Sequence, residues 1–157
     1  MNFSHLNEKN KPIMVDVSTK QITKRLAIAS GKITMNKEAY LAVINQSAKK
    51  GAVINTAIVA AIMGAKKTSD IIPMCHPLNL TKVEVDISAN EKEYSFTLQA
   101  SASLDGKTGV EMEALSAVSI GLLTMYDMLK AIDKTMIISD IKLLQKEGGK
   151  SGQFKRD

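Results

Sequence analysis

The sequence predicts an α+β domain in which helices cover one face of an antiparallel sheet. Residues 81–88 alternate between apolar and charged side chains, residues 94–104 repeat the alternation, and only a short polar stretch separates them. This pattern is typical of an antiparallel hairpin with one wet face. Residues 109–132 carry apolar side chains at alternating spacings of three and four, which is the strongest helical pattern in the chain.

The remaining elements follow from weaker local signals. Apolar residues spaced roughly by two predict a strand over residues 25–35, with an irregularity near Gly31. Asn36 is expected to cap a helix that ends in Lys49, Lys50 and Gly51, because cations and glycine favour a helix C-terminus. A second helix is predicted over residues 53–67.

Two prolines predict a loop over residues 69–80, and a last strand is predicted over residues 136–145. The order strand, two helices, two strands, helix, strand is that of a ferredoxin-like split βαβ sandwich. We therefore expect a mostly flexible arm over residues 1–20, one catalytic domain over residues 21–147, and a tail rich in Gly and Lys over residues 148–157.

Composition limits the function classes. The 157 residues are 45% hydrophobic and 24% charged, and the formal charge of +5 suits an anionic partner. Three Phe and three Tyr are scattered, so no aromatic platform for unpaired bases is expected, and a small phosphorylated molecule fits better than nucleic acid. One Cys and two His exclude a disulfide and a zinc cluster. A polar N-terminus without a signal or membrane span favours the cytoplasm.

The long helix predicts assembly. No charged residue lies between Glu113 and Asp127, whereas a surface helix of a monomer would show a polar stripe. Ala114, Ala117 and Gly121 form a small-residue side suited to close approach, and a second subunit is the simplest cover. Complete burial within one chain is the alternative.

Charge returns to this helix at Asp127 and Lys130, which are neighbours on its surface. An ordinary surface ion pair is one interpretation. The other is an acid and base pair at a desolvated interface, where the pKa of a lysine can be lowered. Glu113 lies about 21 Å away along the axis. If Glu113 and Asp127 serve one substrate, they must come from different subunits.

Two glycine-rich stretches suggest phosphate binding. Residues 106–109 precede the long helix, where free N–H groups attract anions, but Ser101 stands where a Walker loop requires glycine. Residues 148–152 do not form a Walker loop either, because Leu144 stands where its first glycine is required. The cations near the C-terminus fit a phosphate clamp and a solvated tail equally well. Cys75 and His76 fit either a substrate-lining role or a buried thiol beside a hydrogen-bonded imidazole.

Together, five motifs resemble the MoaC family, the cyclic pyranopterin monophosphate synthases of molybdenum cofactor biosynthesis. They occur in the family's order and are Met14-Val15-Asp16-Val17, Met74-Cys75-His76-Pro77-Leu78, the ten residues from Gly106 to Leu115, Tyr126-Asp127-Met128 with Lys130, and residues 148–152. The resemblance implies a ferredoxin-like subunit, a hexamer built as a trimer of dimers, and sites between subunits. It implies no metal or other cofactor.

The implied reaction converts 3′,8-cyclo-7,8-dihydroguanosine 5′-triphosphate to cyclic pyranopterin monophosphate with release of pyrophosphate. By resemblance, the catalytic residues are Asp127, Lys130 and Lys50. The implied substrate-lining residues are Met74, Cys75, His76, Met112 and Glu113, with Glu111 on the pterin side and Arg25, Lys146 and Lys150 on the triphosphate. Lys49, Ala52 and Asp105 depart from the family pattern, and Asp105 is expected to face solvent.

Two further interpretations belong to other classes. A basic ferredoxin-like module could bind RNA without chemistry, but Tyr94 and Phe96 lie on the predicted core face and not on an exposed platform. A purely structural oligomer with a coat of solvated lysines is the other. Substitution of Lys130 or Asp127 distinguishes these interpretations from an enzyme.

Overall fold

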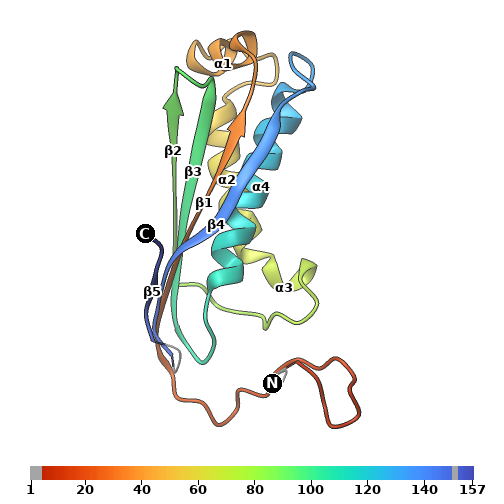
Figure 1. Ribbon diagram of the computed structural model, residues 1–157, viewed down its shortest axis with the longest axis vertical. Coiled ribbons are helices and arrows are strands. Elements are labelled where there is room, and N and C mark those ends of the chain that lie inside the picture. The colour runs from red at the N-terminus through yellow and green to blue at the C-terminus, as the bar shows by residue number, and fades with distance from the viewer. Residues whose placement is uncertain (1–4, 150–151) are drawn as a thin grey trace.

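Five strands form one antiparallel sheet in the computed structural model, which describes residues 5–149 and 152–157 (Figure 1). The spatial order is β2-β3-β1-β4-β5. The strands are β1 (Thr23–Thr34), β2 (Lys82–Asn90), β3 (Ser95–Gly106), β4 (Ile137–Glu147) and β5 (Phe154–Lys155). The β2–β3 hairpin and the ferredoxin-like α+β fold predicted from sequence are confirmed. The short strand β5 lies in the segment predicted as a tail and pairs with β4.

The two long helices, α2 and α4, pack side by side on one face of the sheet, and α1 lies across one end (Figure 1). The helices are α1 (Lys37–Ile44), α2 (Val53–Lys66), α3 (Thr68–Ile71) and α4 (Glu111–Leu129). Helix α4 contacts β1, β3 and β4, so it is the main core helix. The single turn α3 begins at Thr68 and overlaps the start of the loop predicted over residues 69–80.

The predicted irregularity in β1 is a shift in its pairing with β4, between Ile28 and Ala29 and again between Ser30 and Lys32. Gly31 lies in this segment. A Cβ at Gly31 would lie 2.7 Å from a methyl group of Val118 and 2.8 Å from one of Leu122. Glycine therefore allows α4 to close onto the sheet at this point.

Large apolar side chains fill the space between the sheet and α4. Phe96 and Leu98 on β3 are buried, and the ring of Tyr40 on α1 stacks on Phe96 with centroids 5.1 Å apart. Tyr94 lies in the turn before β3 and packs on Tyr40 at 5.7 Å. These aromatic rings belong to the core, as predicted, and leave no stacking platform on β3.

The prediction that α1 ends in Lys49, Lys50 and Gly51 is wrong. The helix ends at Ile44, and Gln46 then takes a positive φ of 52°. Residues 45–51 form an irregular turn, with Gly51 at φ 95°. Lys50 therefore lies on a turn after α1, and the cations play no part in ending the helix.

The small-residue side of α4 faces the chain's own sheet and α2. Ala114 and Ala117 are fully buried, and a Cβ at Gly121 would meet Leu98 of β3 and Ala61 of α2. The prediction that a second subunit covers this side is wrong, because α2 supplies its own small residues for close packing. Exposed apolar side chains of the helix layer include Val59, Met63 and Leu123, which lie elsewhere on α2 and α4.

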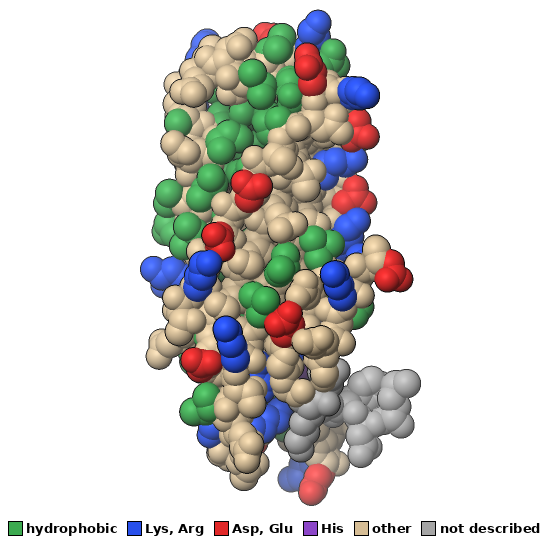
Figure 2. Space-filling model, turned by 90° about the vertical axis from the view of Figure 1, so that its left-hand side faces the viewer, with side chains coloured by type: hydrophobic (Ala, Val, Ile, Leu, Met, Phe, Trp, Pro, Cys, Tyr) green, Lys and Arg blue, Asp and Glu red, His purple; other side chains and the backbone are tan. Residues whose placement is uncertain are grey.

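Helix α4 is long and apolar enough to cross a membrane by length and composition, and no other helix in residues 5–149 and 152–157 is. More than half of its apolar stretch is buried in this fold, as expected of a core helix. On the side of the molecule that carries the edge strand β2, hydrophobic side chains gather toward the end where α1 lies (Figure 2). Charges of both signs are scattered over the rest of that face.

Candidate active site

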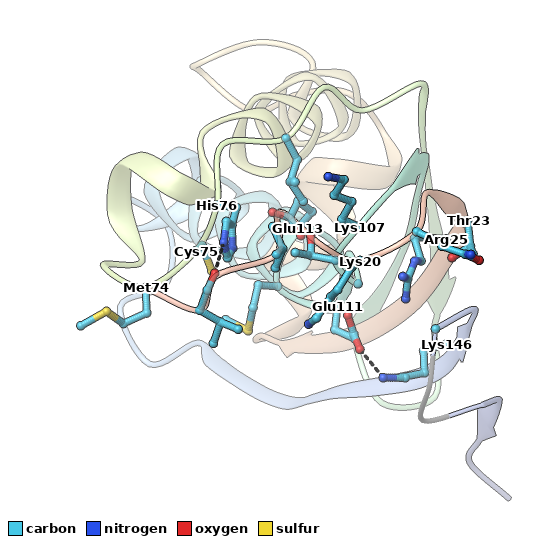
Figure 3. Close-up of a pocket in the computed structure, with 18 of the residues that line it drawn as sticks. Lys20, Thr23, Arg25, Met74, Cys75, His76, Lys107, Glu111, Glu113 and Lys146 are labelled. Carbon is cyan, nitrogen blue, oxygen red and sulfur yellow. Dashed lines mark hydrogen bonds and ion pairs between the residues drawn. The ribbon is translucent and has the colours of Figure 1, made fainter. Parts of the chain in front are cut away.

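A cavity of about 950 Å³ lies at the N-terminal end of α4. Segments far apart in the sequence supply its walls: the N-terminal arm, the start of β1, the loop after α3, the loop between β3 and α4, and β4 (Figure 3). The cavity brings together these predicted substrate-binding residues: Arg25, Met74, Cys75, His76, Glu111, Met112, Glu113 and Lys146. The remaining predicted residue, Lys150, lies outside the described residues.

Arg25 is held in place by backbone groups. Its side chain is only 8% exposed, and Nε donates a hydrogen bond to the carbonyl oxygen of Gly106 at 3.2 Å. Gly148 and Gly149 pass close to this side chain with positive φ values of 92° and 85°, and a Cβ at Gly149 would collide with the guanidinium. The glycine pair therefore lets the chain after β4 wrap around Arg25.

Three lysines join Arg25 around the cavity. Lys146 on β4 pairs with Glu111 at 2.7 Å. Lys107 donates a hydrogen bond to the carbonyl oxygen of Ser18 at 2.6 Å, and Lys20 reaches the cavity from the arm (Figure 3). Four cations therefore face two carboxylates, which gives the cavity a net positive lining suited to a polyanion.

Glu113 and Cys75 lie where burial disfavours negative charge. Glu113 is 4% exposed, and burial raises its pKa, with the charge of Glu111 raising it further. Burial and the neighbouring Glu113 raise the pKa of the Cys75 thiol. A raised pKa leaves less thiolate, so Cys75 is suited to lining the cavity and not to acting as a nucleophile.

His76 anchors the N-terminal arm to the cavity wall. Its Nε2 lies 2.8 Å from the carbonyl oxygen of Val15. A carbonyl oxygen only accepts hydrogen bonds, so Nε2 carries a proton and donates it in a hydrogen bond to Val15. No hydrogen bond joins Cys75 and His76 within the described part of the chain.

The three predicted catalytic residues meet at the other end of α4. Lys130 Nζ lies 2.7 Å from Oδ1 of Asp127, and Lys50 Nζ lies 2.8 Å from Oδ2. Lys50 also donates to the carbonyl oxygen of Asp127 at 3.0 Å. We call these residues the lysine–aspartate cluster. The turn after α1 thus brings Lys50 to the last turn of α4, although 77 residues separate Lys50 from Asp127.

Hydrogen bonds from Lys130 and Lys50 lower the pKa of Asp127 to about 2. The hydrogen bond to Asp127 in turn raises the pKa of Lys130. In a single subunit the pKa of Lys130 is thus raised and not lowered, because its side chain is 53% exposed and paired with a carboxylate. A lowered lysine pKa at a subunit interface stays a prediction. At neutral pH the cluster presents an acceptor flanked by two donors.

The cavity and the lysine–aspartate cluster are separate within one chain. Glu113 and Asp127 lie on the same unbroken helix, so about 21 Å of axis separates them. Asp105 is exposed, as the sequence predicted. Within the described ranges, 5–149 and 152–157, no group of three or more His, Cys, Asp and Glu side chains could hold a metal ion.

Sequence reasoning missed Lys20 and Lys107 as cavity residues. Lys20 lies in a polar arm without periodicity, and Lys107 belongs to a motif read only for its backbone N–H groups. The arm reaches the cavity through hydrogen bonds of its carbonyl groups to His76 and Lys107. A pattern in the sequence cannot show such contacts, because any residue can supply a carbonyl oxygen.

The fold and the cavity define a ferredoxin-like α+β protein with a cavity lined by four cations and two carboxylates. The sequence profile of the MoaC family matches residues 14–149. The chain belongs to the MoaC family, whose enzymes act in molybdenum cofactor biosynthesis.

Several relatives named cyclic pyranopterin monophosphate synthase match nearly the whole chain. The protein of Campylobacter jejuni is 65% identical over 156 residues, which cover 99% of each chain. The protein of Helicobacter hepaticus is 61% identical over 157 residues, covering 100% of this chain and 99% of that protein. The protein of Helicobacter pylori is 59% identical over 154 residues, covering 98% of each.

Proposed function

We propose that this chain is a cyclic pyranopterin monophosphate synthase, a cytoplasmic lyase that acts on 3′,8-cyclo-7,8-dihydroguanosine 5′-triphosphate and releases pyrophosphate. The observation that carries the proposal is the convergence of four cations and two carboxylates in one cavity of about 950 Å³. The relatives that bear this enzyme's name align over almost all of the chain, which supports the same assignment.

The four cations suit the triphosphate. In the phosphate step, a substrate hydroxyl gives its proton to a general base of the lysine–aspartate cluster and attacks the α-phosphorus, the bond from that phosphorus to the bridging oxygen breaks, and pyrophosphate leaves with the bonding electrons. Charge builds on the leaving oxygens, so Lys20, Arg25, Lys107 and Lys146 would stabilise it. Arg25 is held by a backbone carbonyl, so little reorganisation is needed when the substrate binds.

Other residues of the cavity lining suit the purine-derived ring system. Met74, Met112 and Leu78 supply apolar surface, and Glu113 and His76 supply hydrogen-bonding groups. Thr108 adds a buried hydroxyl with no hydrogen-bond partner in the described part of the chain. Such a mixture of apolar walls and a few fixed polar groups is typical of sites for small organic ligands.

Acid and base catalysis belongs to the lysine–aspartate cluster in this proposal. Asp127 accepts protons and the protonated Lys50 and Lys130 donate them during opening and rebuilding of the ring system. Because the cluster and the cavity are about 21 Å apart in one chain, a second subunit must bring its cluster to the cavity. We therefore propose a homodimer with shared sites, assembled into a hexamer as a trimer of dimers.

Incubation with the cyclic GTP-derived substrate tests the proposal. We expect pyrophosphate to be released in step with formation of cyclic pyranopterin monophosphate. The Asp127→Ala and Lys130→Ala variants should stay folded and oligomeric while turnover falls by at least about a hundredfold. Absence of pyrophosphate with the natural chain would refute the proposed function, and full turnover by either variant would remove that residue from the mechanism.

A further inference from the structure

A buried carboxylate that the proposed chemistry does not use, Asp133, lies in the turn between α4 and β4. It is 3% exposed. Its Oδ2 accepts a hydrogen bond from the backbone N–H of Asn36 at 2.7 Å, and its Oδ1 accepts from the N–H and the hydroxyl of Thr135, both at 2.7 Å. Desolvation raises the pKa of Asp133, but these hydrogen bonds outweigh it and leave the pKa below its usual value.

The bond between Asp133 and Asn36 joins segments that are 97 residues apart. Asn36 is the N-cap of α1, and its side chain accepts a hydrogen bond from the N–H of Ala39 at 2.8 Å. Helix α1 lies at the end of the sheet (Figure 1). Among its buried side chains, Tyr40 packs on Phe96 and Tyr94. Asp133 thus fixes the start of α1 against the turn that ends α4.

The same two segments carry the lysine–aspartate cluster. Lys50 follows α1, and Asp127 and Lys130 lie at the C-terminal end of α4, three residues or more before Asp133. Both Lys50 and Asp127 are about half exposed, so little side-chain packing holds their 2.8 Å contact. The placement of α1 relative to the end of α4 therefore decides whether Lys50 reaches Asp127.

We propose that Asp133 is a positioning residue: through its hydrogen bond to the backbone of Asn36, it holds α1 and the following turn so that Lys50 contacts Asp127. The importance of this contact for turnover rests on the proposed function, but the contact itself can be measured without substrate. A displacement of about 1 Å at a catalytic group can lower a rate by roughly a hundredfold.

Two variants remove the hydrogen bond between Asn36 and Asp133, one by changing its acceptor and the other by removing its donor. Asp133→Asn keeps one oxygen for Thr135 and turns an amide group toward the N–H of Asn36, so two donors oppose each other. Asn36→Pro removes the N–H itself, and the φ of −72° at Asn36 fits the value that proline requires.

Each variant has a matched control. Asn36→Ala loses the same side-chain cap as Asn36→Pro but keeps the backbone N–H. Thr135→Val loses one hydrogen bond to Asp133 but keeps the bond to Asn36. Val118→Ala removes buried volume from the same helix, about 14 Å before Asp127, and controls for general loss of stability.

The first readout is the titration midpoint of the Asp127 carboxyl, followed by NMR. Lys130 on α4 and Lys50 on the turn after α1 are the charged groups that contact it. Loss of Lys50 should raise the midpoint of Asp127 by roughly half a pH unit or more in Asp133→Asn and Asn36→Pro. In the three controls it should stay within about 0.2 unit of the natural chain.

The second readout is turnover. Asp133→Asn and Asn36→Pro should lower kcat at least about tenfold and change KM less than about twofold, because the cavity that binds the substrate is at the other end of α4. An unchanged Asp127 midpoint in both variants overturns the proposal, and so does an equal rise in Asn36→Ala. If Asp133→Asn does not fold, the two Asn36 variants decide. Lack of turnover by the natural chain refutes the proposed function alone, since the Asp127 titration still decides this inference.

Discussion

Glu113 and Asp127, near opposite ends of α4, lie in opposite electrostatic environments. Glu113 is buried and its pKa is raised by desolvation, whereas Asp127 is exposed, paired with two lysines, and has a pKa of about 2. Carboxyl groups whose pKa values are driven apart in this way are suited to different tasks. Glu113 is suited to forming a hydrogen bond with bound substrate, and Asp127 is ionised at physiological pH before any proton is transferred to it.

Because the pKa of Glu113 is raised in the folded state, an ionised Glu113 lowers the free energy of unfolding at neutral pH. Between its unfolded and folded pKa values the native state binds more protons than the unfolded state, so stability falls as pH rises through that window. We expect Glu113→Gln to unfold roughly 3 °C higher than the natural chain at pH 8, with no gain below pH 4. The variant should lose substrate binding in the same preparation. Thermal unfolding at the two pH values measures the effect.

Glu91→Gln is the matched control, because Glu91 lies exposed in the turn between β2 and β3. It should leave the unfolding temperature unchanged at both pH values. A stability of Glu113→Gln equal to or lower than that of the natural chain at pH 8 would contradict the assignment of Glu113 as a desolvated carboxylate.

Helices and strands with a strong hydrophobic periodicity were predicted well, and those whose ends depend on single contacts were not. The β2–β3 hairpin and α4 follow from alternation and from helical spacing, which report burial directly. The end of α1 was wrong because Gln46 adopts a left-handed conformation that no local signal required. The pairing of β5 with β4 depends on a chain reversal after β4 that passes through two glycines with positive φ.

Within this chain reversal, Gly149 is a glycine that lies against a cavity residue, Arg25. A Cβ at this position would displace the guanidinium of Arg25. We expect Gly149→Ala to raise KM for the triphosphate substrate roughly tenfold, because one charge-assisted contact is lost, and to lower kcat as well, because Arg25 also stabilises the charge on the leaving pyrophosphate. Steady-state kinetics measure both values.

Gly152→Ala separates this collision from backbone strain. Gly152 also has a positive φ, 68°, but a Cβ there would meet nothing within 4 Å. Both variants should lose about 1 kcal/mol of stability, and only Gly149→Ala should show the higher KM. An equal rise in KM for both would mean that strain in the tail, and not Arg25, determines substrate binding.

At the scale of the whole molecule, α4 separates the functional groups. The cavity lies at its N-terminus, the lysine–aspartate cluster at its C-terminus, and about 21 Å of helix lies between Glu113 and Asp127. Exposed apolar side chains remain on the helix layer at Val59, Met63 and Leu123. These observations support the proposal that a second subunit completes each site.

Mixing two inactive variants tests that proposal. A heterodimer of Asp127→Ala and Glu113→Gln subunits would contain one site with both mutations and one site with neither. Random pairing makes half of the dimers heterodimers, so we expect about one quarter of the natural activity to return. Activity measured before and after joint refolding of equal amounts gives the answer.

Asp127→Ala mixed with Lys130→Ala is the control, because both substitutions lie in the same cluster and every shared site keeps one of them. This mixture should stay inactive. If the first mixture also stays inactive after subunit exchange is demonstrated, the catalytic groups are not shared between subunits.

The sequence by itself determined the α+β fold, the hairpin, the core helix and the spacing that keeps Glu113 and Asp127 apart, because periodicity reports which side chains are buried. It also placed the family's motifs, and therefore most residues of the cavity. Only the tertiary structure decided that Lys50 meets Asp127, that α2 covers the small-residue side of α4, and that the arm brings Lys20 to the cavity. Each of these depends on contacts between segments far apart in the chain, made through backbone carbonyls, glycines and turns, which carry no periodic signal.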